Sequence, residues 1–216
     1  MGIFPAERCV PIRLHSLTTL LGRSAAATIR HVRARCSHLT QVSLPSISST
    51  LRPPTIPKET MQWSHPETVG EIPPPCRAHS ATQVDRRIFV FGGGEGPMYF
   101  NHLYALDTVM RRWTKISHPP NTPQPISRRA HATWYYQGKV YLFGGGNGAK
   151  ALNDLWSLDV NVPYDKMRWE PVEVRGAKPK PRGYHTANLI GDSVVIIGGS
   201  DGTECFEDVW VLKLGA

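Results

Sequence analysis

The sequence lacks long apolar runs, closely spaced cysteines and, over its first quarter, acidic and aromatic residues. No stretch approaches the roughly 18 uncharged apolar residues that a membrane helix needs, so we expect no membrane span. The four cysteines are Cys9, Cys36, Cys76 and Cys205, and no two of them form a CxxC pair. This spacing argues against a disulfide scaffold and a zinc site built on paired cysteines, and it favours a reducing, cytoplasmic location.

The segment 1–60 differs in composition from the rest of the chain. It holds eight of the 25 Lys and Arg residues but two of the 17 Asp and Glu residues, and so carries +6 of the formal net charge of +8. Phe4 is the single aromatic residue before position 61. Because such a segment can bury little apolar area, we expect a disordered basic Ser/Thr/Pro-rich tail at 1–60 and a folded region at 61–216. An Arg-rich, acid-poor start is also typical of a mitochondrial presequence, which is the alternative.

An internal repeat, present in three copies at nearly constant spacing, organises the folded region. Its landmarks are three glycine pairs, and the first glycine of each pair follows a histidine at the same distance in every copy. The copies occupy about 76–116, 126–171 and 180–214. Short β-branched and aromatic runs broken by Gly and Pro predict four short strands per copy. The glycine pairs are Gly92 with Gly93, Gly144 with Gly145, and Gly198 with Gly199.

These copies resemble the kelch repeat. The resemblance rests on Arg-x-x-His, an apolar residue before Gly-Gly, the run Asn-Asp-Leu-Trp-Ser-Leu-Asp at 153–159, and a later tryptophan. It implies an all-β kelch β-propeller with about three four-stranded blades, in which Trp113 and Trp169 pack between blades. The long spacing is similar to that of fungal cell-end and Rab-effector kelch proteins.

The number of strands bears on whether the blades can close into a ring. The third copy shows three strands only, and residues 61–64 around Trp63 are similar to a fourth strand without its own blade. Kelch propellers often use a terminal strand to complete the last blade, so we expect a strand at 61–64. Three blades are too few to close a ring. The sequence therefore predicts a partial propeller, two copies that associate to complete a ring, or a truncated fragment of a larger kelch protein.

The resemblance implies a noncatalytic platform for protein–protein interaction, with no cofactor. In kelch binding domains the loops before the first strand and after the glycine pair line one face. Arginines offer paired donors to carboxylates and aromatic residues offer contact area, so these loops are the candidate partner-binding surface. The alternative is that the arginines bind carbonyl groups within their own blade. The candidates are Arg77, Arg128, Arg129, Arg182, Tyr99 and Asn147.

Other functions have weaker support. The remaining +2 on residues 61–216 gives no electrostatic case for nucleic acid. A galactose-oxidase-like enzyme with a metal site would need tyrosines, histidines and a cysteine, and Tyr99, Tyr135, Tyr136 and Cys205 are of the right types but not in the right spacing. The repeated histidines each belong to a different copy and show no metal-binding spacing, so we expect them to make local hydrogen bonds on the inner strands. They are His79, His131 and His185.

Overall fold

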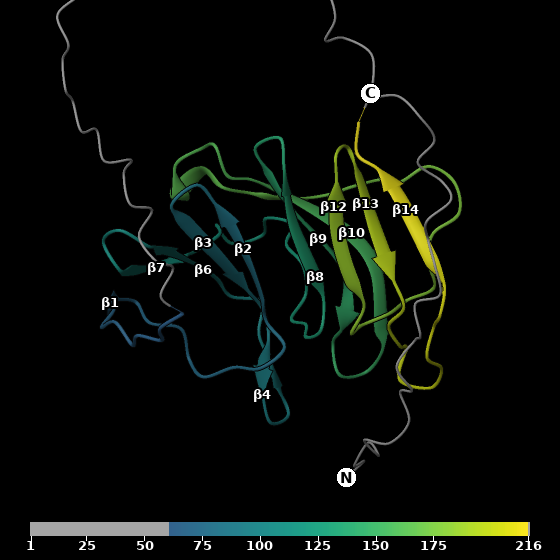
Figure 1. The fold of residues 1–216 in the computed structure, drawn as a ribbon, viewed down its shortest axis with the longest axis horizontal. Coiled ribbons are helices and arrows are strands. Elements are labelled where there is room, and N and C mark those ends of the chain that lie inside the picture. The colour runs from purple at the N-terminus through teal and green to yellow at the C-terminus, as the bar shows by residue number, and fades with distance from the viewer. Residues whose placement is uncertain (1–60, 216) are drawn as a thin grey trace, which may run out of the picture. The chain divides into compact units, whose positions relative to one another are not determined.

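The computed structural model describes residues 61–215, and Ser64–Ala216 forms a compact unit (Figure 1). The predicted tail and the presequence alternative fall on residues 1–60, which lie outside the described residues. Within the described residues the chain forms strands and one short 3₁₀ helix, η1 (Tyr164–Lys166). The all-β prediction is therefore confirmed.

The strands form three main sheets, one for each copy of the repeat. The first is ordered β1-β7-β6-β3-β2, the second β11-β10-β9-β8, and the third β12-β13-β14. The first sheet holds β1 (Val69–Gly70), β2 (Ser80–Val84), β3 (Arg87–Phe91), β6 (Leu103–Asp107) and β7 (Arg112–Ile116). The second holds β8 (Ala132–Tyr136), β9 (Lys139–Gly146), β10 (Ala151–Asp159) and β11 (Trp169–Pro171). The third holds β12 (Thr186–Ile190), β13 (Ser193–Ile197) and β14 (Val209–Lys213).

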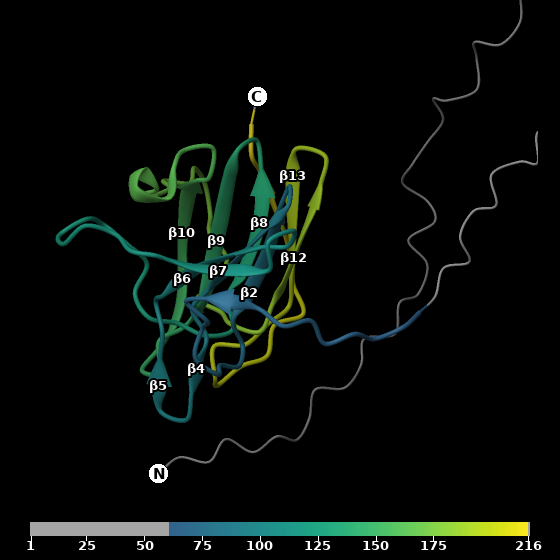
Figure 2. The same ribbon diagram turned by 90° about the vertical axis from the view of Figure 1, so that its left-hand side faces the viewer.

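Tight hairpins join the inner strands because the sequence places turn residues there. Gln137 and Gly138 link β8 to β9 with φ angles of 44° and 82°. Two successive positive φ angles match the right-handed twist of the paired strands, which is why such turns dominate two-residue hairpins. At the other end of the blades, β4 (Gly94–Glu95) and β5 (Met98–Tyr99) form a small ribbon that projects away from this turn (Figure 2).

The three sheets stand next to one another as propeller blades, with β2, β8 and β12 innermost (Figure 1). Backbone hydrogen bonds link successive blades at their entrances. The amide of Ala130 donates to the carbonyl of Ala78 at 2.9 Å, and the amide of Tyr184 donates to the carbonyl of Ala130 at 2.9 Å. Each blade is thus placed on the one before it by the same contact, which confirms a partial propeller.

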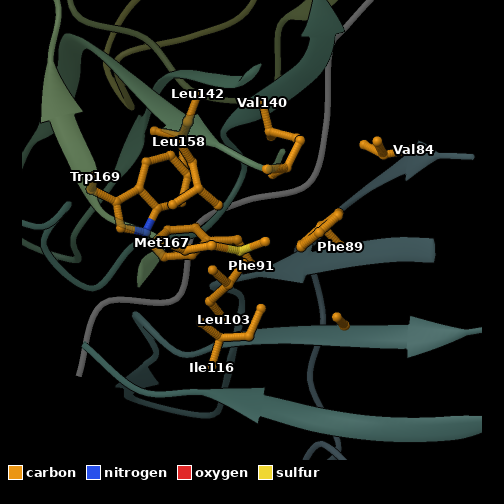
Figure 3. Close-up of a cluster of buried hydrophobic side chains, with 12 residues drawn as sticks. Val84, Phe89, Phe91, Leu103, Ile116, Val140, Leu142, Leu158, Met167 and Trp169 are labelled. Atoms are coloured by element: carbon orange, nitrogen blue, oxygen red, sulfur yellow. The ribbon is translucent and has the colours of Figure 1, made fainter. Parts of the chain in front are cut away.

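Two apolar cores lie between blades. The first joins the first and second blades, where Trp169 is 2% exposed and meets Phe91 edge-on with ring centroids 5.2 Å apart (Figure 3). Burial of such a side chain contributes on the order of 2–3 kcal/mol. The second joins the second and third blades through Trp134, Phe143, Leu155, Val194 and Ile196. Because both cores lie between sheets, neighbouring blades stabilise each other.

The strand predicted at residues 61–64 does not form within a single chain. These residues form no strand, and Trp63 is fully exposed. The first strand is instead β1, which pairs in parallel with β7 at the outer edge of the first blade. A strand needs a neighbouring edge to satisfy its backbone groups, and no strand of the described chain pairs with residues 61–64.

Candidate partner-binding surface

Two of the candidate arginines are buried inside their own blades. The guanidinium of Arg128 donates to both carboxylate oxygens of Asp154, at 2.7 and 2.8 Å, and to the carbonyl of Gly144 at 2.9 Å. Burial of the Asp154 carboxylate disfavours its charge, but the hydrogen bonds and charge of Arg128 outweigh burial and lower its pKa. Trp156 adds a third donor, because its indole nitrogen lies 2.7 Å from Oδ2 of Asp154.

The third blade repeats this clamp. Arg182 pairs with both oxygens of Asp208 and donates to the carbonyl of Gly198 at 2.9 Å. The indole of Trp210 donates to Asp208 at 2.7 Å. The hydrogen bond from Arg182 is the largest cause that lowers the pKa of Asp208 to about 2. A carboxylate with this many charge-assisted donors stays ionised at all ordinary pH values.

This arrangement corrects the role expected for two candidates. Arg128 and Arg182 are both 0% exposed. Their donors are occupied by carboxylates and carbonyls of their own blade, which is the alternative that the sequence left open. The candidate surface is therefore narrowed to the four remaining residues: Arg77, Arg129, Tyr99 and Asn147.

The first blade has no such clamp. The register of the repeat places Cys76 at the position of Arg128, His102 at that of Asp154 and Tyr104 at that of Trp156. All three members are replaced together. Burial lowers the pKa of the His102 imidazole, with a smaller contribution from the charge of Lys115. In place of the clamp, the His102 ring stacks on Phe100 with centroids 5.6 Å apart and meets Tyr104 edge-on at 6.2 Å, and Sγ of Cys76 lies 3.5 Å from Nδ1 of His79.

The same register places Arg77 at the exposed position and not at the clamp. Backbone bridges pair Arg77 with Gly94, Arg129 with Gly146 and Gly183 with Ser200. Arg77 therefore corresponds to Arg129, and its side chain is exposed. The spacing to the histidine agrees: Arg77 and Arg129 stand two residues before theirs, and the buried arginines of the clamp stand three residues before theirs.

Two of the repeated histidines lie in the seams between blades. His131 is 7% exposed and its Nε2 lies 2.8 Å from the hydroxyl of Ser80, so this bond joins the second blade to the first. Burial, followed by the charge of Arg128, lowers the pKa of His131 to about 3. His185 packs edge-on against Phe143 at 5.3 Å, and burial followed by Arg182 lowers its pKa to about 4. The expected local bonds within an inner strand are thus replaced by contacts across a seam.

Three of the remaining candidates meet at the junction of the first and second blades. The guanidinium carbon of Arg129 lies 3.9 Å from the centre of the Tyr99 ring, and Nη1 of Arg129 lies 3.3 Å from the carbonyl oxygen of Gly96. A side chain at Gly148 would lie 2.9 Å from the same ring, so the loop that follows Asn147 packs closely on Tyr99. Asn147 shapes that loop, since its Oδ1 accepts the amides of Ala149 and Lys150 at 3.0 and 2.9 Å.

The sequence missed one residue of this surface. Tyr184 is 79% exposed and has a φ of 60°, and it occupies the position of Ala78 and Ala130 in the other blades. A positive φ is unfavourable for a bulky residue, and such strain is found where the surrounding structure imposes it. The signal in the sequence was a tyrosine in the third copy where the first two copies have alanine.

Comparison with known proteins decides the family. The model of the KLHDC2/KLHL20/DRC7 Kelch-repeats domain matches residues 55–216. The chain belongs to the kelch-repeat family. The resemblance drawn from the repeat is thereby confirmed, while the narrower likeness to fungal cell-end and Rab-effector kelch proteins stays a prediction.

Curated proteins with similar kelch sequences are much longer than the part that matches. The chain is 35% identical over 162 residues to the dynein alpha chain of the flagellar outer arm of Chlamydomonas reinhardtii, covering 71% of this chain and 3% of that protein. It is 34% identical over 173 residues to human host cell factor 2, covering 72% and 22%. It is 32% identical over 155 residues to rat kelch domain-containing protein 3, covering 65% and 38%.

The kelch fold separates the residues suggested for a copper site. Tyr99 lies on the loop surface, Tyr135 packs against the first core and Tyr136 against the second. Among residues 61–215 no group of three or more His, Cys, Asp or Glu side chains is placed to hold a metal ion. In the same part of the chain, no helix has the length and apolar character required to cross a bilayer.

Proposed function

We propose that this kelch domain is a noncatalytic protein-binding platform whose contact surface is centred on Arg129 and Tyr99. The observation that carries the proposal is the stacking of these two side chains at the junction of two blades, with the loop after Asn147 packed on Tyr99 and Tyr184 exposed on the entrance of the next blade. A guanidinium held on an aromatic ring presents its remaining donors in one plane, which suits carboxylate groups of a protein partner. Aromatic and Arg residues are also those that most often dominate the energy of protein interfaces.

The test is affinity capture with the full chain and two charge reversals. Arg129→Glu should reduce capture of a partner at least tenfold, because it breaks the stacked pair and reverses the charge. The control is Lys166→Glu in the exposed η1 helix, which follows β10 at the opposite end of the second blade and should leave capture unchanged. Equal capture by the native chain and Arg129→Glu contradicts the proposal. One copper or iron ion per purified chain would favour the enzyme alternative.

A second proposal concerns self-association, and it is supported by the free face of the third blade. In the first blade Val84, Phe91 and Leu103 are at most 3% exposed because the second blade covers them. Their equivalents in the third blade are Ile190, Ile197 and Val209, which are 65%, 38% and 60% exposed. We infer that this face receives another blade, and that a second copy supplies it to complete a ring.

Solution mass measured by light scattering after size exclusion tests the association. The native chain should form a discrete dimer, and Val209→Lys should weaken that dimer at least tenfold, because a charge replaces apolar area at its centre. Val109→Lys is the matched control, since Val109 is 69% exposed in the turn between β6 and β7, away from this face. A monomeric native chain contradicts the association without affecting the Arg129 surface.

We infer a cytoplasmic location from the cysteine usage, with a mitochondrial location as the alternative if residues 1–60 act as a presequence. Fluorescence microscopy of the chain fused at its C-terminus to a fluorescent protein distinguishes the two. Diffuse signal supports the cytoplasm, and signal that coincides with a mitochondrial marker contradicts it.

A further inference from the structure

An apolar groove lies beside the outer edge of the third blade. Its volume is about 810 Å³. The second blade contributes Phe143, Leu155 and Val174 to its walls, and the third contributes Trp210, Leu212 and Leu214. Open apolar grooves of this size next to a strand edge are where extended segments of other chains pair.

The strand that borders the groove has a free edge. In the first and second blades the third strand pairs with a fourth, β6 with β7 and β10 with β11. In the third blade β14 pairs with β13, and among residues 61–215 no strand pairs with its other side (Figure 1). The groove and the free edge together mark the place of one missing strand.

The second blade shows what fills such a place. There β11 pairs with β10 so that Trp169 stands opposite Leu158. Trp169 and Met167 then pack against Phe91 and Leu103 of the preceding blade (Figure 3). By the repeat, Phe91 and Leu103 correspond to Phe143 and Leu155, which line the open groove. The groove is therefore lined by the repeat equivalents of the side chains against which Met167 and Trp169 pack in the second blade.

This chain carries a second copy of that pattern. Residues 61–63 read Met-Gln-Trp, as residues 167–169 read Met-Arg-Trp. Trp63 precedes His79 by the same interval by which Trp169 precedes His185. Both Met61 and Trp63 are fully exposed. An exposed methionine and tryptophan at this spacing match the groove in chemistry and in position along the repeat.

We propose that residues 61–65 of one copy form the fourth strand of the third blade of a second copy. The register of β10 and β11 places Trp63 opposite Leu212 and Ser64 opposite Val211. Trp63 then lies against Phe143 as Trp169 lies against Phe91.

Among residues 61–215, the order of the blades excludes the same copy as the donor of this strand. A fourth strand is followed along the chain by the first strand of the next blade, as β11 is followed by β12. Residues 61–65 are followed by β1 and β2 of the first blade, so by the same rule they belong to a blade that precedes the first. Within one chain the second blade separates the first from the third, whereas a second copy docked on the free face of the third blade places its own first blade there. The inference rests on the self-association proposed above and names the segment that each copy exchanges.

Disulfide formation between differently tagged full-length copies tests the register. One copy carries Ser64→Cys and the other Val211→Cys, two positions predicted to face each other at the roughly 4.5–5.5 Å separation of antiparallel neighbours, within disulfide range. Mild oxidation should link the two tags. The control pair is Ser64→Cys with Lys213→Cys, which is out of register by two residues and should form at least tenfold less of the linked product. Equal yields of the two pairs overturn the proposal.

A peptide experiment tests the exchange of residues 61–65 independently of dimer formation. A labelled peptide of residues 57–68 is titrated into the full-length Trp63→Ala chain, whose own donor strand is disabled. Fluorescence anisotropy should show binding that is at least tenfold weaker for the same peptide with alanine at position 63. Equal affinity of both peptides, or no binding to a chain that retains its strand content by circular dichroism, overturns the strand exchange. If native dimers form and the peptide still fails to bind, self-association stands and the exchanged strand does not.

Discussion

At the scale of single residues, a buried arginine–carboxylate pair stabilises the second and third blades. Arg128 and Arg182 are long charged side chains with no exposure, and both are paired with a carboxylate and with backbone carbonyls. Removing one partner from such a pair leaves an uncompensated charge, which is costly in a buried site. The first blade lacks this arginine–carboxylate pair, because Cys76 stands at the position of the arginine and His102 at that of the carboxylate.

Replacing the buried arginine should therefore destabilise the domain strongly. Arg128→Met removes the donors to Asp154 and Gly144, and we expect the free energy of unfolding to fall by about 3 kcal/mol. The matched control is Arg77→Met, an exposed arginine, for which a change within about 0.5 kcal/mol is expected. Urea unfolding followed by circular dichroism measures both values. If both variants lose the same free energy of unfolding, the buried pair of Arg128 and Asp154 does not stabilise the domain more than an exposed arginine does.

The seam histidines predict that stability depends on pH. The pKa of His131 is lowered to about 3 and that of His185 to about 4, both below the ordinary value of about 6.5. The folded state therefore keeps both imidazoles neutral while the unfolded state protonates them, so stability is full above about pH 6.5 and falls as the pH drops towards 4.

At pH 5 each of these histidines should cost about 2 kcal/mol relative to neutral pH. His102 and His118 have pKa values lowered in the same direction, so a double variant His131→Gln/His185→Gln should lose part of the pH slope and not all of it. Urea midpoints at pH 7 and pH 5 give the slope. A native chain with the same midpoint at both pH values contradicts the prediction.

At the scale of elements, the glycine pairs let one blade approach the next. Gly144 has a φ of 66°, and a Cβ there would lie 2.7 Å from the carbonyl oxygen of Arg182 in the following blade. Gly198 is its repeat equivalent, with a φ of 62°, but a Cβ there would meet only the carbonyl oxygen of Phe206, at 3.2 Å. The two glycines share the same backbone strain and differ in whether a blade follows.

This difference gives a matched pair of variants. Gly144→Ala should destabilise the monomer by about 1–3 kcal/mol more than Gly198→Ala, because the added methyl group overpacks the seam in the first case alone. Chemical unfolding at low protein concentration measures the difference. If the two variants lose the same stability, the cost lies in the positive φ and the close approach of blades is not its cause.

At the scale of the whole molecule, the three blades formed by residues 61–215 leave a face and an edge open. The face carries Ile190, Val209 and Val211, each about 60% exposed, and the edge is the free side of β14. Open sheet edges beside apolar surface favour pairing with other chains. The domain therefore has a physical reason to associate, which is separate from the loop surface around Arg129.

Association should make thermal stability depend on concentration. Binding that occurs only in the folded state raises the melting temperature as protein concentration rises. We expect the Tm of the native chain to increase over a hundredfold range of concentration, measured by scanning calorimetry. In Val209→Lys the same rise in Tm should require a protein concentration at least tenfold higher. A constant Tm for the native chain would indicate that the open face is not covered by a second copy.

The sequence alone determined the architecture because the repeat is local. The glycine pairs, the turn at Gln137 and Gly138 and the aromatic runs each act through nearby residues, and their register predicted the blades and the four strands of the second copy. The partner-binding role of the loop surface stays a prediction.

Tertiary structure decided what depends on contacts between distant residues. It buried Arg128 and Arg182, stacked Arg129 on Tyr99 and exposed Tyr184, since pairing with Asp154 or Asp208 requires segments far apart in the chain to meet. It also left residues 61–64 without a strand. A strand forms only where the edge of a neighbouring strand satisfies its backbone hydrogen bonds. The sequence pattern indicates which residues can form a strand, but it does not indicate which edge is available to pair with them.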